Sequence, residues 1–123
     1  YIRDLRNSSM HNILALIDKE VNENYMKPLT LKYLSEKYYL NTAYLGQLFK
    51  KNYNKSFKDH LNYYRIEKAS LMLKRSNEKI YKIAEDVGYN NTDYFISKFV
   101  QIKGVTPLQY RKKFRDLNHI STK

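Results

Sequence analysis

Apolar residues recur mainly three and four positions apart along this chain, the spacing that places side chains on one face of a helix. Ile13, Leu14, Ile17 and Val21 form such a stripe within residues 10–25. The 123 residues include only 3 Gly and 2 Pro, and no alternating run predicts a strand. We therefore predict an all-α fold of about seven helices with short connections.

Local residues predict where these helices begin and end. Residues suited to capping a helix N-terminus are Thr30, Asn41, Ser56, Asn91 and Thr106, the last followed by a first-turn proline. Residues suited to ending a helix are Asn54, Gly88 and Gly104. The longest predicted helix, residues 57–75, has no internal breaker, whereas the last is expected to end near residue 115.

The chain contains an internal repeat. Leu34, Ser35, Glu36 and Lys37, then Asn41, Tyr44, Leu45 and Phe49, return as Ile83, Ala84, Glu85 and Asp86, then Asn91, Tyr94, Phe95 and Phe99. The offset is 49 residues before the predicted turn and 50 after it. A small residue, Ser35 or Ala84, lets the first helix of each repeat lie close to the second. In the first repeat, Tyr44 of the second helix is predicted to point inward. Each repeat is therefore a predicted helix-turn-helix.

The repeats divide the chain into a first helix-turn-helix subdomain over residues 1–55, a linking helix over 56–75, a second subdomain over 76–115 and a frayed tail over 116–123. At 1.5 Å per residue the helix over 57–75 is a rod of about 28 Å. Successive major grooves on one side of a DNA duplex lie about 34 Å apart. We therefore expect one chain to place two recognition helices in neighbouring grooves.

Charge points to an acidic partner. Lys and Arg number 23 against 12 Asp and Glu, a formal net charge of +11. Residues 1–40 carry six basic and five acidic residues, 41–75 eight and two, and 76–123 nine and five. The 42% hydrophobic content is too high for a disordered basic tail, and the absence of Cys excludes disulfides and thiolate metal sites. We expect a cytoplasmic protein, and the first residue, Tyr1, suggests a piece of a longer one.

Five segments together resemble the DNA-binding domain of the AraC/XylS transcription regulators, over about residues 11–115. They are residues 41–51, 64–69, 83–89, 94–99 and, most specific of all, the run from Gly104 to Arg111. The sequence of these segments is most similar to output domains of two-component response regulators, in which a receiver domain precedes the helices. The resemblance implies two helix-turn-helix subdomains joined by a long helix, with double-stranded DNA as the partner.

The candidate DNA-binding residues lie on the outer faces of the two second helices. They are Thr42, Ala43, Gly46, Gln47, Lys50 and Lys51 in the first repeat, and Asn91, Thr92, Asp93, Ile96, Ser97 and Lys98 in the second. The resemblance implies base contacts for Ala43, Gly46 and Gln47 and for Thr92, Asp93, Ile96 and Ser97, and the lysines are expected near phosphates. Gly46, Asp93 and Ile96 depart from the small polar or basic residues usual at such positions.

No candidate catalytic or metal-binding residues emerge. His11, His60 and His119 lack the spacing of metal ligands, and no nucleophile elbow, phosphate-binding glycine loop or HExxH motif is present. We expect no enzyme, no cofactor and no membrane partner, with an RNA polymerase subunit as a further partner beside DNA. The alternatives are a helical protein-interaction module and a non-specific nucleic-acid binder.

Overall fold

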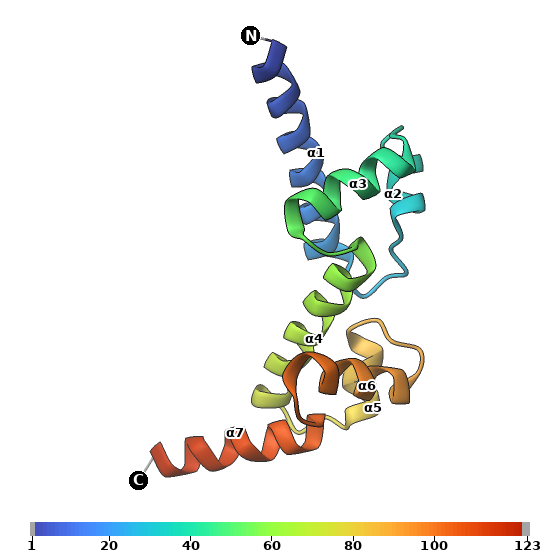
Figure 1. Cartoon of the computed structure of the whole chain (residues 1–123). Coiled ribbons are helices and arrows are strands. Elements are labelled where there is room, and N and C mark those ends of the chain that lie inside the picture. The colour runs from blue at the N-terminus through green and yellow to red at the C-terminus, as the bar shows by residue number, and fades with distance from the viewer. Residues whose placement is uncertain (1, 122–123) are drawn as a thin grey trace. The chain divides into compact units, whose positions relative to one another are not determined.

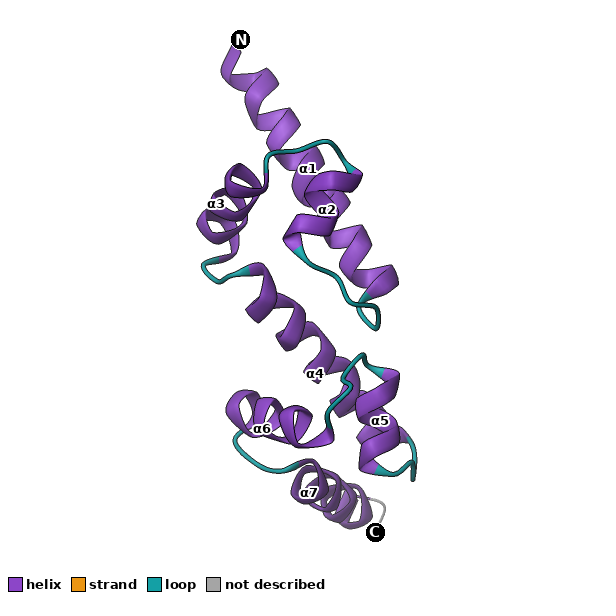
Figure 2. Cartoon of the chain, turned by 90° about the vertical axis from the view of Figure 1, so that its right-hand side faces the viewer, coloured by secondary structure: helices purple, strands orange, loops and turns teal. Residues whose placement is uncertain are grey.

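The computed structural model describes residues 2–121 of the chain, and side chains over residues 10–115. This part of the chain holds seven helices and no strand (Figures 1 and 2), which confirms the predicted all-α class. The helices are α1 (Ile2–Asn24), α2 (Leu31–Lys37), α3 (Thr42–Tyr53), α4 (Phe57–Arg75), α5 (Ile80–Asp86), α6 (Thr92–Lys103) and α7 (Pro107–Ser121).

The two outermost helices are longer than the sequence predicts. Helix α1 begins at Ile2 rather than near residue 10, and α7 continues to Ser121 rather than ending near residue 115. Neither extension contains Gly or Pro, so nothing in the local sequence ends the helix there. Of the predicted frayed tail, residues 122–123 lie outside the described residues.

The chain forms two compact units, residues 1–61 and 62–123. The first unit contains α1, α2, α3 and the start of α4, and the second contains the rest of α4 with α5, α6 and α7. Helix α4 has the predicted bounds, residues 57–75, and belongs in part to each unit.

Side-chain caps begin the helices where the sequence predicts. The Asn41 side chain accepts a hydrogen bond from the Tyr44 backbone N–H at 2.9 Å, and Asn91 accepts one from Tyr94 at the same distance. Thr30 does the same for the Tyr33 N–H at 3.0 Å. Each cap satisfies a backbone donor that has no partner within its helix, and so fixes the first residue of the helix.

The core of the first unit lies between α1 and the two short helices. Ile17 and Val21 of α1 are buried with Leu34 of α2 and with Leu45 and Phe49 of α3. Phe49 also packs edge-on against the Phe57 ring, with centroids 5.6 Å apart. The prediction that Tyr44 points inward is wrong, because its side chain is 50% exposed. Leu45 and Leu48 occupy the buried stripe instead, and Tyr44 lies at its flank.

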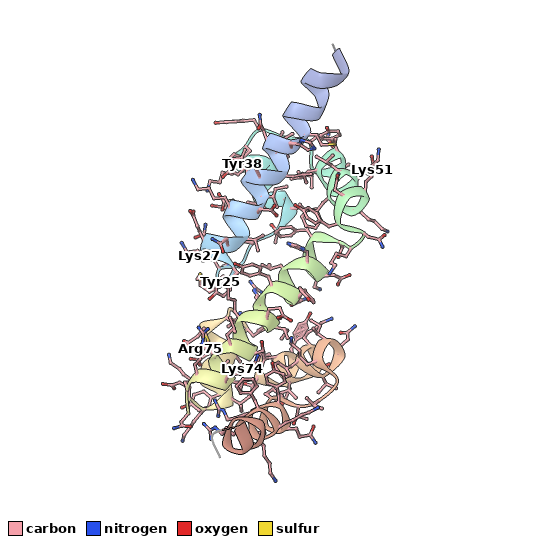
Figure 3. All side chains as sticks on the ribbon, turned by 90° about the vertical axis from the view of Figure 1, so that its left-hand side faces the viewer. Tyr25, Lys27, Tyr38, Lys51, Lys74 and Arg75 are labelled. Carbon is pink, nitrogen blue, oxygen red and sulfur yellow. The ribbon has the colours of Figure 1, made fainter. Side chains whose placement is uncertain are left out.

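A buried carboxylate ties α1 to α2. Glu20 accepts hydrogen bonds from the Lys37 ammonium and the Tyr38 hydroxyl, both at 2.5 Å, and from the Asn24 side chain at 3.2 Å. Figure 3 shows Tyr38 beside α1. The hydrogen bonds from Lys37 and Tyr38 lower the pKa of Glu20. The ionised carboxylate therefore stabilises the folded unit.

The second unit is held together by a different set of polar groups. The Arg111 guanidinium of α7 donates to the backbone carbonyls of Leu73 at 3.2 Å and Glu78 at 2.7 Å. The Tyr89 hydroxyl donates to the buried Asn62 side chain at 2.7 Å. The guanidinium thus supplies donors for carbonyls at and after the C-terminal end of α4.

The apolar core of the second unit joins α4, α5 and α6. Leu73, Ile83, Phe95 and Phe99 are fully buried. Leu71, also in α4, is 36% exposed and stands outside this core. Among the described residues, no helix has both the length and the apolar content to cross a membrane.

Candidate nucleic-acid interface

The first helix-turn-helix consists of α2, the turn over residues 38–41 and α3. Helix α2 packs on α3, and the small Ser35 is buried at their junction. The Ser35 and Thr42 hydroxyls lie 2.5 Å apart in a hydrogen bond that links the two helices. The predicted DNA-binding residue Thr42 therefore also has a structural role at the start of α3.

Helix α3 separates a buried stripe from an exposed face. Leu45, Leu48 and Phe49 are buried. The candidate residues Ala43, Gln47, Lys50 and Lys51 are exposed, and Gly46 is half-buried. Figure 3 shows Lys51 on the side of α3 away from α1. The structure thus brings the six candidates of the first repeat together on one helix, with five of them outside the core.

The end of α3 is fastened to α1. The Tyr53 hydroxyl donates to the Asp18 carboxylate at 2.9 Å, and burial together with this hydrogen bond raises the pKa of Tyr53 to about 12. The His60 ring lies 5.1 Å from the Phe49 and Tyr53 rings, and burial lowers the pKa of His60. These contacts orient α3 on the first unit and leave its outer face unobstructed by them.

The second helix-turn-helix consists of α5, the turn over residues 87–91 and α6. Phe95 and Phe99 are buried, Asp93 and Ser97 are exposed, and Ile96 is half-buried. Thr92 and Lys98 are also half-buried. The side-chain oxygen of Asn91 accepts the capping bond that begins α6, so this predicted DNA-binding residue has a structural role as well.

The lysines of α6 have partners within the second unit. The Lys98 ammonium donates to Gln101 at 3.2 Å and lies 5.5 Å from the centre of the Tyr94 ring. The Lys103 ammonium forms an ion pair with Glu67 at 2.5 Å. No such partner occurs for Lys50 or Lys51 among the side chains that the structure describes. The positive charge available to an anion is therefore greater on α3.

Two exposed residues beside the predicted interface were missed by the sequence reasoning. Val100 is 38% exposed and stands fifty residues after Lys50, so the repeat offset would have placed it on the outer face of α6. Tyr39 is 95% exposed in the turn before α3 and has a left-handed backbone with φ +56°. The repeat aligns Tyr39 with Gly88 in the sequence, and this alignment could have identified Tyr39 as unusual.

Other chemistry has little support in the described side chains. They contain no group of three His, Cys, Asp or Glu residues placed to hold a metal ion. The candidate residues that the structure does group are those of α3 and of α6, each set on the helix that follows a tight turn. Each of these two helices can enter a major groove of a double-stranded nucleic acid with its exposed face.

Comparisons with known proteins agree with this geometry. The model of a family described as "Helix-turn-helix domain" matches residues 34–113. The C-terminal domain of the two-component response regulator yesN from Fusobacterium nucleatum is 44% identical, with a TM-score of 0.77 over 81% of this chain and 98% of that one. The C-terminal domain of AraT, a response regulator from Geobacillus stearothermophilus, is 31% identical, with a TM-score of 0.79 over 82% and 84% of the two chains.

A curated relative is a longer protein, of which this chain matches one part. The uncharacterized HTH-type transcriptional regulator YdeC of Bacillus subtilis is 33% identical over 92 residues, which are 75% of this chain and 32% of YdeC. The chain thus spans about a third of that regulator.

Proposed function

Because the chain belongs to the helix-turn-helix domain family of AraC-type transcription regulators, we propose that it is the DNA-binding part of a bacterial regulator acting in the cytoplasm. It binds double-stranded DNA in a sequence-specific way and has no catalytic role. The observation that carries the proposal is the duplicated helix-turn-helix, in which the outer faces of α3 and α6 stand outside the core.

The two recognition helices divide the work of binding between them. Ala43, Gly46 and Gln47 of α3 face base edges, and Lys50 and Lys51 neutralise phosphates. On α6, Ser97 and Thr92 offer hydroxyls to bases or phosphates, and Ile96 suits the methyl group of a thymine. Asp93 accepts a hydrogen bond from a cytosine amino group and disfavours a nearby phosphate. Thr42, Asn91 and Lys98 lie at the edges of these faces.

The rest of the regulator supplies control. Similarity to C-terminal domains of response regulators supports an upstream receiver domain in the same protein. A subunit of RNA polymerase is a further partner of a regulator bound at a promoter. The described chain binds the DNA site. The receiver domain supplies the signal, and the polymerase subunit supplies the response.

Selection of bound sites from random duplexes, followed by titration against a scrambled duplex of equal length, tests the proposal. We expect the selected duplex to bind more tightly, by about 1000-fold or more, the low end for specific recognition. Affinity should fall on the order of 1000-fold between 50 and 200 mM salt if 6 to 10 phosphates are contacted, as is usual. Equal affinity for both duplexes would identify a non-specific binder, and no affinity for either would favour a protein-interaction module.

Two variants separate base reading from phosphate binding on α3. Gln47→Ala should change the preference at one or two base pairs, because it removes a side chain that reaches base edges. Lys50→Ala should weaken binding to all duplexes alike and reduce the salt slope by about 0.9. If the two variants behave alike, the assignment of these roles is wrong.

A further inference from the structure

The turns of the two helix-turn-helix units share one backbone conformation but not one residue type. In the first, the Leu40 N–H donates to the Ser35 carbonyl at 2.7 Å, and in the second the Tyr89 N–H donates to the Ala84 carbonyl at 2.9 Å. Each bond closes a Schellman motif, whose central residue is left-handed. That residue is Gly88 in the second turn, with φ +106°, and Tyr39 in the first, with φ +56°.

Tyrosine is an unfavourable residue for this conformation. A left-handed backbone brings Cβ close to the following carbonyl oxygen, which glycine avoids and asparagine tolerates. The second bond of the motif reflects the difference, at 3.4 Å from the Tyr39 N–H to the Glu36 carbonyl against 3.0 Å from Gly88 to Glu85. At the end of α3 the chain uses Asn54 in the left-handed region, and at the end of α6 it uses Gly104.

Packing does not compensate for the cost of Tyr39. Its side chain is 95% exposed, so the ring buries almost no apolar surface within the unit. Because Tyr39 gains no packing within its own unit, its strained backbone points to a contact with a partner outside the unit.

The position of Tyr39 indicates that contact. It stands two residues before Asn41, the residue that caps α3, in the loop that joins α2 to α3 (Figure 1). In a helix-turn-helix the N-terminal residues of the second helix enter the major groove, so the residues just before them meet the sugar-phosphate edge of that groove. A tyrosine hydroxyl is an established type of donor to phosphate.

We propose that Tyr39 is a contact to the DNA backbone, in which its hydroxyl donates a hydrogen bond to a phosphate at the edge of the groove that α3 enters. The contact belongs to the first helix-turn-helix alone, since Gly88 has no side chain to make it. This inference rests on the proposed function, and it adds a residue that positions α3 on the duplex without reading its sequence.

Two variants of the 123-residue chain test the contact. Tyr39→Asn relieves the backbone strain, as Asn54 does at the end of α3, and should raise the melting temperature by a few degrees. The same variant should bind selected and scrambled duplexes about three- to tenfold more weakly, the loss expected for one hydrogen bond. Tyr39→Phe keeps the ring and should show most of that loss with no change in melting temperature.

The salt dependence provides a matched control. Tyr39 is uncharged, so Tyr39→Phe should leave the slope of affinity against salt unchanged, whereas Lys50→Ala should reduce it. A more stable Tyr39→Asn with unaltered affinity for both duplexes would overturn the proposal, as would a loss confined to one sequence. Failure of the unmodified chain to bind any duplex would instead contradict the proposed function.

Discussion

The two helix-turn-helix units share a frame but differ on their outer faces. In both, an asparagine caps the second helix and a buried phenylalanine near its middle packs on the core, with Phe49 and Phe99 at equivalent places. Outside this frame Lys50 corresponds to the exposed Val100. The two repeats thus share the residues that build the helix pair and differ in the residues that their outer faces expose.

The difference in charge suggests unequal roles for the two helices. Helix α3 carries Lys50 and Lys51 in its last turn with no acidic residue in its first, whereas α6 begins with Asp93 in its first turn. Lys103, at the end of α6, is paired with Glu67. We infer that the first unit supplies more of the electrostatic affinity, and that α6 contributes through shape and hydrogen bonding.

The largest effect should come from the shared frame. Phe49→Ala and Phe99→Ala each remove a fully buried ring, so each should cost about 3–5 kcal/mol of unfolding free energy. Amide hydrogen exchange, read separately over residues 31–53 and 80–103, should show that each variant loses protection mainly in its own unit. Equal loss in both units after either substitution would show that the two unfold as one cooperative body.

A smaller effect should distinguish the units by pH. The pKa of Glu20 is lowered by its hydrogen bonds from Lys37 and Tyr38, so its stabilising contribution is present above the usual glutamate pKa of 4.5. It is lost as the pH falls through the lowered pKa. The Arg111 guanidinium of the second unit stays protonated throughout this range. Acidification should therefore remove the contribution of this carboxylate from the first unit, whereas the hydrogen bonds of Arg111 in the second unit persist.

Glu20→Gln tests the source of that difference. At pH 7 the variant should lose about 1–3 kcal/mol, because a buried acceptor of several hydrogen bonds becomes a weaker one. At pH 3, below the usual glutamate pKa of 4.5, the variant and the unmodified chain should differ less in stability than at pH 7. Urea titrations at both pH values measure the difference, and an equal loss at pH 7 and pH 3 would exclude the carboxylate charge as the cause.

The unequal charge of the two recognition helices can be altered directly. Val100→Lys places a cation at the position of α6 that corresponds to Lys50, on a side chain already 38% exposed. One added phosphate contact should raise affinity several-fold at low salt and steepen the salt slope by about 0.9. Titrations at several salt concentrations measure both quantities. An unchanged slope would place this face of α6 away from phosphates.

The frame was predictable from the sequence because its signals are local. Asn41, Asn91 and Gly104 fix helix ends through bonds to residues at most four positions away, and the structure places them as expected. The repeat offsets likewise located both helix-turn-helix units. The bounds of α4 followed from the absence of any breaker between residues 57 and 75.

The long-range polar contacts of Glu20 and Arg111 were not predictable in the same way. Glu20 reads as one more charged residue on α1, and only its partners seventeen and eighteen positions away make it a buried anchor. Arg111 likewise reaches a carbonyl 38 residues back. Tyr44 was misplaced because its position lies at the flank of the buried stripe, where spacing alone cannot decide exposure. Long-range packing settles such positions.

The smallest effect concerns Gly46, whose counterpart in the second unit is Ile96. A glycine inside a helix costs about 0.5–1 kcal/mol relative to alanine. An added Cβ would lie 3.6 Å from Leu31 Cδ1, an ordinary van der Waals contact, so the fold has room for Gly46→Ala. We therefore expect the variant to gain most of that free energy in urea unfolding.

The DNA affinity of Gly46→Ala then decides why the glycine is there. If α3 approaches the duplex closely at this point, the added methyl group meets DNA and the affinity falls several-fold although the fold is more stable. Fluorescence anisotropy with the selected duplex measures this change. Unchanged affinity would mean that the first recognition helix leaves a gap to the duplex at Gly46.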